Sequence, residues 1–337
     1  MKLLTVTVPC YNSQDYMEKC IDSLLTGGER VEIIIIDDGS KDTTGSIADA
    51  YAEKYPSIVR VIHQENGGHG EGINQGIAHA SGIYFKVVDS DDKVSEDFPA
   101  FLDVLEQCEA EGGVDLLNTN YYYVHEDGVG DRPIKYGSAL PKAKIVGWKQ
   151  TRPFTLEQMI TLHSSTFRTE LMRKWPFALP KHTFYEDNLM VHLTIPYIQR
   201  IYYMDVDLYR YTIGRAGQSV QSDMMKKRYM HQLNVTKMCF MSCHLDDIRE
   251  PLQKKYMKHE LFMMFAISIA FARLNRSAEA DAALDEMWAE CKAYDAKWAK
   301  HFRNGPLWFM SIPGKFGQSF SCFIYRTANK VVRFNQS

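Results

Sequence analysis

The chain has 337 residues, of which 45% are hydrophobic, and a formal net charge of −3 at neutral pH. This length is typical of about two domains, and the apolar content is ample for a large core. The pI near 6.4 argues against nucleic acid as a partner. The longest apolar run, 261–272, is too short to span a bilayer, and MKLLTVTVPCYN is typical of a first strand rather than a signal peptide. With seven cysteines and no Cys-x-x-Cys pair, we expect a cytoplasmic protein.

The N-terminal third alternates short apolar runs with helix-like periodicity. We expect strands at 3–8, 31–36, 58–63, 83–88 and 114–122. Helices are expected between them, through 16–24, 47–51, 73–80 and 99–109, with Ser13 and Asp42 able to cap the first two. This alternation predicts an α/β fold, with a doubly wound, mostly parallel sheet and helices on both faces.

The remainder of the chain is less regular at first and then helical. Residues 125–155 are polar and weakly periodic, and a long irregular stretch of this kind is usually functional or mobile. Helix and strand signals resume at 156–211. Strong helical periodicity follows at 224–242, 250–273 and 278–300, so we expect a helical C-terminal region.

Carboxylates follow two of the buried strands. VEIIIIDDGSKD ends in Asp37 and Asp38, and YFKVVDSDD ends in Asp89, Asp91 and Asp92. Ligands of open α/β sheets bind beyond the carboxyl ends of the strands, so this pattern predicts a hard divalent cation with a polar ligand beside it. Taken singly, either cluster is also compatible with an ordinary turn or a helix N-cap.

Several other motifs are absent or incomplete. The glycines from Gly67 to Gly76 do not meet the G-x-G-x-x-G spacing of dinucleotide sites. His69-Gly70-Glu71 matches the H-x-E of zinc deaminases, but no Pro-Cys-x-x-Cys follows. A P-loop and the G-x-S-x-G of α/β-hydrolases are also missing.

Five motifs together carry a family resemblance: VPCYN (8–12), IDDGSKD (36–42), NGGHGEGINQGI (66–77), VVDSDD (87–92) and YED (185–187). In this order and at these separations they resemble the family-2 glycosyltransferases, which have a GT-A fold, invert configuration and use nucleotide-diphospho-sugars. The resemblance implies a GT-A catalytic domain over 1–215. The helical region, 216–337, would then contact acceptor, membrane surface or another subunit.

The resemblance also implies roles for individual residues. Asp187, following Glu186, corresponds to the general base that activates the acceptor hydroxyl. Asp91, with Asp89 nearby, corresponds to the ligands of Mg²⁺ or Mn²⁺, which neutralises charge on the leaving diphosphate. Donor-binding roles fall on Pro9, Tyr11, Asn12, Asp38, Gly68, Asn74, Asp89, Ser90 and Arg215.

One position departs from the family pattern. Many relatives have Ala-Arg-Asn where this chain has Gly72-Ile73-Asn74, so another cation must replace that arginine or its contact is lost. His163 is expected to face the acceptor or to be an ordinary buried histidine. The absence of Gln-x-x-Arg-Trp favours a non-processive enzyme.

The sequence therefore predicts an inverting transfer from a UDP-sugar to a glycan or lipid-linked acceptor in cell-surface polysaccharide or glycolipid synthesis. A sugar nucleotidyltransferase and a catalytically inactive homologue remain alternatives. Residues 296–337 combine cations and aromatics without any acidic residue, which is typical of contact with an anionic membrane or of a packed terminal helix pair. A homo-oligomer stays open.

Overall fold

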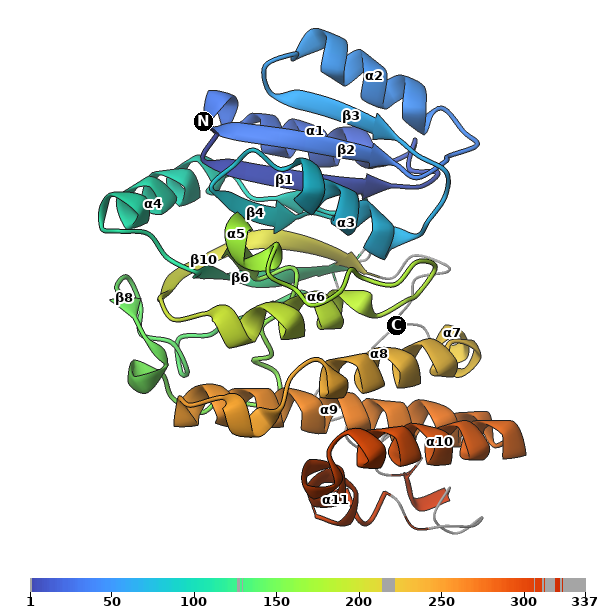
Figure 1. Cartoon of the computed structure of the whole chain (residues 1–337). Helices are drawn as coiled ribbons and strands as arrows, with labels where there is room; N and C mark the ends of the chain where they lie inside the picture. The colour runs from blue at the N-terminus through green and yellow to red at the C-terminus, as the bar shows by residue number, and fades with distance from the viewer. Residues whose placement is uncertain are drawn as a thin grey trace. The chain divides into compact units, whose positions relative to one another are not determined.

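The computed structural model describes residues 2–125, 128, 130–213, 222–305, 307–310, 312, 319–321 and 323, without the side chains of 222, 223 and 225. Its contacts divide the chain into two compact units, Met1–Ile213 and Gly214–Ser337. The first unit contains all of the strands that the structure describes, and the second is helical (Figure 1).

A single mixed sheet organises the first unit. Its strand order is β3-β2-β1-β4-β9-β6-β10-β5, with β7 paired to β6 and β8 to β10. The strands are β1 (Leu4–Cys10), β2 (Val31–Asp37), β3 (Val59–His63), β4 (Tyr84–Val87), β5 (Lys93–Val94), β6 (Leu116–His125), β7 (Arg132–Ile134), β8 (Ile145–Val146), β9 (Ser165–Arg168) and β10 (Ile201–Ile213).

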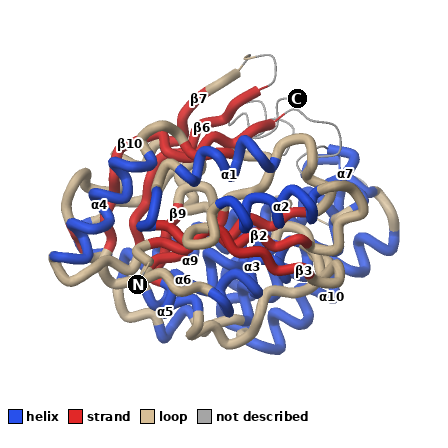
Figure 2. The backbone as a smooth tube through the Cα atoms, turned by 90° about the horizontal axis from the view of Figure 1, so that it is seen from above, coloured by secondary structure: helices blue, strands red, loops and turns tan. Residues whose placement is uncertain are grey.

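Helices cover both faces of the parallel part of the sheet, and α1 and α3 lie on opposite sides of β2 (Figure 2). The helices of this unit are α1 (Met17–Leu25), α2 (Thr44–Lys54), α3 (His69–His79), α4 (Phe98–Ala110), α5 (Thr169–Met172) and α6 (Glu186–Thr194). The predicted α/β class is confirmed, and the five expected strands are present with ends shifted by a few residues.

Parallel pairing covers only part of the sheet. Strands β3, β2, β1 and β4 are parallel neighbours, as predicted. Strand β9 is inserted between β4 and β6 and runs antiparallel to both. The prediction missed this strand because its sequence, STFR, is short and mostly polar, so it has no apolar run by which to recognise a buried strand.

The core explains why these strands form. All four isoleucines of Ile33–Ile36 are fully buried, because β2 pairs with β1 on one side and β3 on the other while helices cover its faces. Asp42 accepts a hydrogen bond from the Thr44 N–H at the start of α2 (3.0 Å), as expected of a cap. The prediction for Ser13 was wrong: its hydroxyl contacts the Ser90 hydroxyl at 2.8 Å instead.

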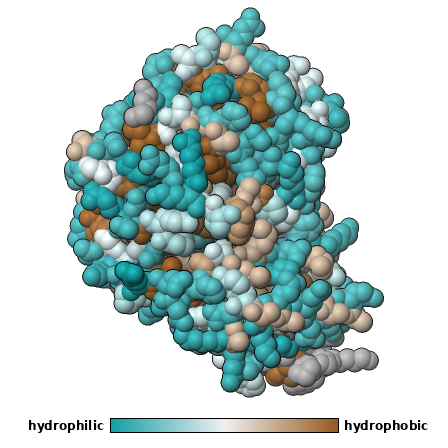
Figure 3. All heavy atoms as spheres, viewed as in Figure 1, coloured by the Kyte–Doolittle hydropathy of each residue, from teal (hydrophilic) through white to brown (hydrophobic). Residues whose placement is uncertain are grey.

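The second unit is built from α7 (Ser222–Lys227), α8 (Tyr229–Met241), α9 (Pro251–Asn275), α10 (Ala278–Tyr294) and α11 (Ala296–Asn304). Its core is aromatic: the Phe265 ring stacks on Trp288 at 4.5 Å and lies 5.3 Å from Phe302. Among the described residues, no helix combines the length and apolar character needed to cross a membrane. Side chains on the face in Figure 3 are mostly hydrophilic, with interrupted apolar patches.

Glycines let helix α3 pack tightly on strand β1. A Cβ at Gly76 would lie 2.4 Å from the Thr7 hydroxyl oxygen and 2.6 Å from its Cβ, and one at Gly72 would lie 3.1 Å from the Pro9 Cβ. Real Cβ atoms do not approach so closely, so a side chain here would force the helix away from the sheet.

We therefore expect Gly76→Ala to destabilise the protein by about 1–3 kcal/mol, the usual cost of overpacking. Gly147→Ala is the matched control, because its Cβ would meet its nearest neighbours at an ordinary 3.4 Å. Urea unfolding of both variants measures the difference. Equal stability of the two would contradict the close-packing explanation.

Candidate active site

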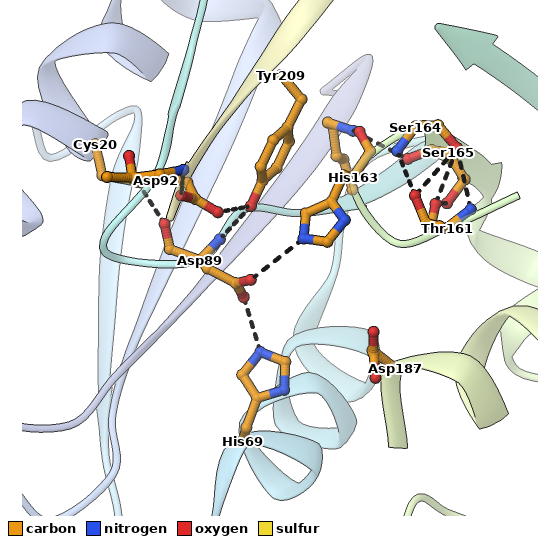
Figure 4. A network of polar contacts seen from close by, with 12 residues as sticks. Cys20, His69, Asp89, Asp92, Thr161, His163, Ser164, Ser165, Asp187 and Tyr209 are labelled. Atoms are coloured by element: carbon orange, nitrogen blue, oxygen red, sulfur yellow. Dashed lines mark hydrogen bonds and ion pairs between the residues drawn. The ribbon is translucent and has the colours of Figure 1, made fainter. Parts of the chain in front are cut away.

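The two carboxylate clusters predicted from the sequence meet at one edge of the sheet. Strand β1 lies between β2 and β4, so the turn after Asp37 and the turn beginning at Asp89 are neighbours there. The N-termini of α3 and α6 add His69, Glu186 and Asp187 to the same region (Figure 4).

Asp38 closes the glycine-rich turn before α3. Its carboxylate accepts hydrogen bonds from the Gln64 amide (2.6 Å) and from the backbone N–H groups of Gly67 (2.7 Å) and Gly68 (2.8 Å). Asp38 is only 4% exposed, so these donors offset the cost of burying its charge. In this structure the carboxylate holds the turn; its predicted contact with a nucleotide base stays a prediction.

The glycines of this turn allow other parts of the protein to approach closely, and the predicted donor contact of Gly68 stays a prediction. A Cβ at Gly68 would lie 2.9 Å from the His182 backbone nitrogen, and Gly68 has a φ of +86°. A Cβ at Gly70 would lie 2.8 Å from the Glu186 Cγ. The segment before α6 can therefore approach α3 closely, which brings Glu186 to the site.

Asn74 also contacts this segment. Its amide donates to the Leu179 carbonyl (2.9 Å) and accepts from the Leu179 N–H (3.0 Å). Ile73, at the position where many relatives have arginine, is fully buried. A core position cannot supply the missing cation, and the cation nearest in sequence on α3 is His69, one turn earlier.

The remaining predicted donor residues lie along the same edge. Tyr11 is 52% exposed and follows the end of β1 beside Pro9, so its ring is accessible. Asn12 has a φ of +50° and its side-chain oxygen accepts from the Lys41 N–H (2.8 Å). Ser90 is buried against Ser13. Arg215 lies outside the described residues.

Three side chains at this edge have the composition of a metal site. One ligand atom each of Asp89, Asp92 and His163 lies within 4.8 Å of the other two. Asp91, the ligand favoured by the sequence, is partly buried and does not belong to this set. Its assignment stays a prediction, with Asp92 as a competitor that the sequence did not single out.

Asp92 already has structural partners. Its carboxylate accepts from the Tyr209 hydroxyl (2.7 Å) and from the Thr212 N–H (2.7 Å), which joins the turn after β4 to β10 (Figure 4). Burial, together with the charges of Asp91 and Asp89, raises the pKa of Asp92 well above its usual value. This crowding of like charges favours either protonation or a bound cation.

His163 lies among aromatic rings. Its imidazole stacks on Tyr211 at 4.3 Å and meets Tyr209 edge-on at 4.9 Å. Burial lowers the pKa of His163 to about 4, so the ring is neutral near pH 7 and keeps a lone pair available for a metal. Its Nε2 lies 4.0 Å from Asp89 Oδ2.

Lys86 fixes the backbone around His163. Its ammonium, on β4, donates to the carbonyls of His163 (3.0 Å) and Ser165 (3.1 Å) and is 1% exposed. Burial lowers the pKa of Lys86 to about 7. The prediction missed this residue, although a lysine inside an apolar strand is a visible signal.

The first turn of α6 presents two acidic residues. Glu186 is 2% exposed, and its Oε1 lies 2.7 Å from the His69 Nδ1. The Asp187 carboxylate accepts from the Asn188 amide (3.1 Å). Burial first, and then the charge of Glu186, raise the pKa of Asp187 to about 7. A carboxylate with this pKa is suited to general base catalysis at neutral pH.

His69 connects the two sides of this edge. Its Nε2 lies 2.9 Å from Asp89 Oδ1, so the ring contacts both Asp89 and Glu186. Although burial disfavours its charged form, these two carboxylates raise the pKa of His69 well above its usual value. The prediction discarded His69 with the incomplete deaminase motif, and no spacing rule in the sequence links it to Glu186.

Solved structures with a similar fold include enzymes that bind nucleotide sugars. S. aureus TarS (residues 1–349), solved with UDP-GlcNAc, superposes with a TM-score of 0.66 and 20% identity, covering 99% of this chain and 92% of that one. The mannosyltransferase PcManGT of Pyrobaculum calidifontis, solved with GDP-Man and Mn²⁺, gives a TM-score of 0.53 at 14% identity, covering 98% and 88%. These likenesses confirm the GT-A fold.

Curated relatives match over parts of their length. Glycosyltransferase GlyG of Streptococcus pneumoniae is 41% identical over 130 residues, or 38% of this chain and 42% of the relative. EpsJ of Bacillus subtilis, described as an uncharacterized glycosyltransferase, is 32% identical over 189 residues, or 56% and 51%. The chain thus spans about half the length of these relatives. Residues 5–171 match the model of glycosyl transferase family 2, and the chain therefore belongs to this family.

Proposed function

We propose that the protein is an inverting, non-processive glycosyltransferase that moves a hexosyl or N-acetylhexosaminyl group from a UDP-sugar to an acceptor hydroxyl. The acceptor would be a glycan or lipid-linked glycan of the cell surface. The observation that carries the proposal is the convergence of Asp89 and Asp187 at the carboxyl edge of a GT-A sheet. The UDP complexes of TarS support the choice of nucleotide.

The proposed mechanism is a single displacement at the anomeric carbon. Asp187 would take the proton of the acceptor hydroxyl while that oxygen attacks, and the sugar would leave the diphosphate with inverted configuration. Attack from one side and departure on the other require base and diphosphate on opposite sides of the sugar. Asp187 on α6 and Asp89 after β4 come from separate elements, which permits that division.

The donor set fits a divalent cation. Two carboxylates and a neutral imidazole suit Mn²⁺, and carboxylate oxygens alone suit Mg²⁺. Asp89 with Asp91, or Asp89 with Asp92 and His163, would hold the ion. When bound, the cation supplies charge neutralisation for the leaving diphosphate.

The test of the function is release of nucleoside diphosphate from a panel of donors: UDP-GlcNAc, UDP-Glc, UDP-Gal and GDP-Man, each with Mn²⁺, Mg²⁺ or EDTA. We expect turnover with one UDP-sugar and a divalent cation, and loss of turnover in EDTA. The panel reports the donor without requiring the acceptor. Absence of release from every donor, with UDP binding intact, would favour an inactive binding homologue instead.

Metal-ligand variants distinguish Asp91 from Asp92. We expect Asp91→Asn to lower Mn²⁺-dependent turnover by about 10²-fold or more, the usual effect of losing charge stabilisation at a leaving group. Asp92→Asn should keep its Mn²⁺ response, because its partners Tyr209 and Thr212 indicate a structural role. For both variants, UDP binding is measured as the Mn²⁺ concentration is raised. The reverse pattern would assign the ion to Asp89, Asp92 and His163.

The base assignment predicts a defined pH dependence. Asp187 must be ionised to accept a proton, so kcat should rise with pH through about 7, the value set by burial and Glu186. Asp187→Asn should lower kcat by about 10²–10⁴-fold, with little change in donor affinity, and abolish this acidic limb. If kcat is kept and only the donor KM rises, Asp187 belongs to donor binding.

We further propose that the helical unit contacts an anionic membrane surface. Cations at the start of α9 and on α11 form a basic face, joined where the Lys258 Nζ lies 4.9 Å above the Trp298 ring. Asp246 neutralises part of it through Lys297 and Lys254, and Asp285 pairs with Arg303. Trp308, 61% exposed, follows α11. The face comprises Arg249, Lys254, Lys255, Lys258, Lys297, Lys300 and Arg303. Most of the predicted 296–337 segment, including Lys315, Arg326, Lys330 and Arg333, lies outside the described residues.

Charge reversal tests this contact. Lys255→Glu, Lys258→Glu and Lys300→Glu together should abolish co-sedimentation with anionic liposomes, since each surface cation contributes on the order of 1 kcal/mol. A matched triple reversal at three exposed lysines of the first unit, Lys144, Lys149 and Lys174, should leave the co-sedimentation unchanged. The basic face would be rejected as a membrane contact if the two triple variants pellet equally, or if the wild-type protein pellets with no liposome.

A further inference from the structure

One imidazole ring joins two carboxylates that come from distant parts of the chain. The Nδ1 of His69 lies 2.7 Å from Glu186 Oε1, and the Nε2 lies 2.9 Å from Asp89 Oδ1. His69 is the first residue of α3, Asp89 follows β4, and Glu186 begins α6. Figure 4 shows the His69 ring in contact with the Asp89 side chain, with Asp187 on the neighbouring helix.

When both carboxylates are ionised, both contacts require the ring to donate. Ionised carboxylates only accept hydrogen bonds, so a histidine that bonds two of them must carry a proton on each nitrogen. An imidazolium presents these two donors in opposite directions from a rigid plane. No amide or ammonium side chain offers the same pair, because an amide has one accepting end and an ammonium has a single donating centre.

The surrounding structure fixes the position of this ring from both ends. The Asp38 carboxylate binds the N–H groups of Gly67 and Gly68, directly before His69. A Cβ at Gly70 would lie 2.8 Å from the Glu186 Cγ, so the absence of this atom leaves room for the Glu186 side chain. These features are independent of the His69 ring, yet both bring it between its two partners.

We propose that His69 is a positioning residue that couples the donor-side carboxylate, Asp89, to helix α6, which carries Asp187. This inference rests on the proposed glycosyltransferase function. His69 contacts both Asp89 and Glu186, and Glu186 is the residue directly before Asp187. The other titratable side chains around Asp89 are His163, which is neutral near pH 7, and Lys86.

The coupling has a consequence for the reaction. If Asp89 moves when a donor binds, the ring transmits that movement to the first turn of α6. The base would then reach its working position with donor in place. Loss of the ring should therefore slow the chemical step more than it weakens donor binding.

The chain contains a matched control. His63 also bonds two carboxylates, Asp37 through Nδ1 (2.9 Å) and Asp49 through Nε2 (3.0 Å), but it lies at the end of β3, outside the residues placed in the site. His63→Ala removes the same kind of bridge and so carries a similar cost in stability. Only His69→Ala removes the link between Asp89 and α6.

The experiment compares His69→Ala, His69→Gln, His69→Lys and His63→Ala with wild type in the donor-release assay. We expect all three His69 variants to lower kcat by about 10–10²-fold, as is usual for residues that orient a site, with the donor KM changed by less than about 3-fold. His69→Lys keeps a positive charge but not the two-ended geometry, so it should stay impaired. His63→Ala should turn over like wild type.

Two further readouts separate positioning from general loss of structure. The side chain of His69 is 35% exposed, so added imidazole should reach the space left in His69→Ala and restore part of kcat, and no such rescue is expected in His69→Lys. UDP binding without metal should be unchanged.

The outcomes distinguish failure of this inference from failure of the function. If wild type is active and His69→Ala matches His63→Ala in kcat, or loses only stability and shows no imidazole rescue, His69 is not a positioning residue while the function stands. If wild type releases no diphosphate from any donor, the proposed function itself fails. If His69→Ala does not fold, His69→Gln, which keeps one contact, decides by the same comparison.

Discussion

The site depends on how the protein accommodates several carboxylates at one edge of a sheet. Each ionised carboxylate that leaves water needs hydrogen-bond donors or a nearby cation. Asp38 has three donors, Asp92 has a tyrosine hydroxyl and a backbone N–H, and Asp89 and Glu186 share His69. Asp187 accepts from the Asn188 amide, and burial together with the like charge of Glu186 raises its pKa to about 7. Hydrogen bonds to Asp187 therefore do not fully offset the cost of burying its charge near Glu186.

The same carboxylates also explain the positions of the glycines in the turn before α3. The backbone N–H groups of Gly67 and Gly68 serve Asp38, and the absent side chain of Gly70 admits Glu186. The turn is thus glycine-rich because the helix it begins must approach β1, Asp38 and α6 at the same time. The close contacts of this turn are with Asp38, with His182 and with Glu186.

The sequence was sufficient for the parallel part of the fold. Apolar runs such as Ile33–Ile36 locate strands because burial on both faces leaves a continuous signal. Strand β9 escaped because its antiparallel pairing at mid-sheet is carried by a short, mostly polar segment. The site was predictable where motifs had carboxylates at strand ends. It was not predictable for His69, whose partner Glu186 lies 117 residues away. Lys86 was visible as a lysine inside an apolar strand, but its contacts with the carbonyls of His163 and Ser165 were not.

Lys86 helps to explain why the two oxygens of Asp89 have neighbours of different charge. Its buried ammonium holds the chain at His163 and Ser165, which places a neutral imidazole beside Asp89 among the rings of Tyr209 and Tyr211. His69 places a charged imidazole on the other oxygen of the same carboxylate. Asp89 therefore has a cationic neighbour facing α6 and an uncharged, lone-pair-bearing neighbour facing β10. If a metal ion binds at Asp89 as proposed, the first ring would repel it and the second could bind it, so the two histidines would keep the cation away from Asp187.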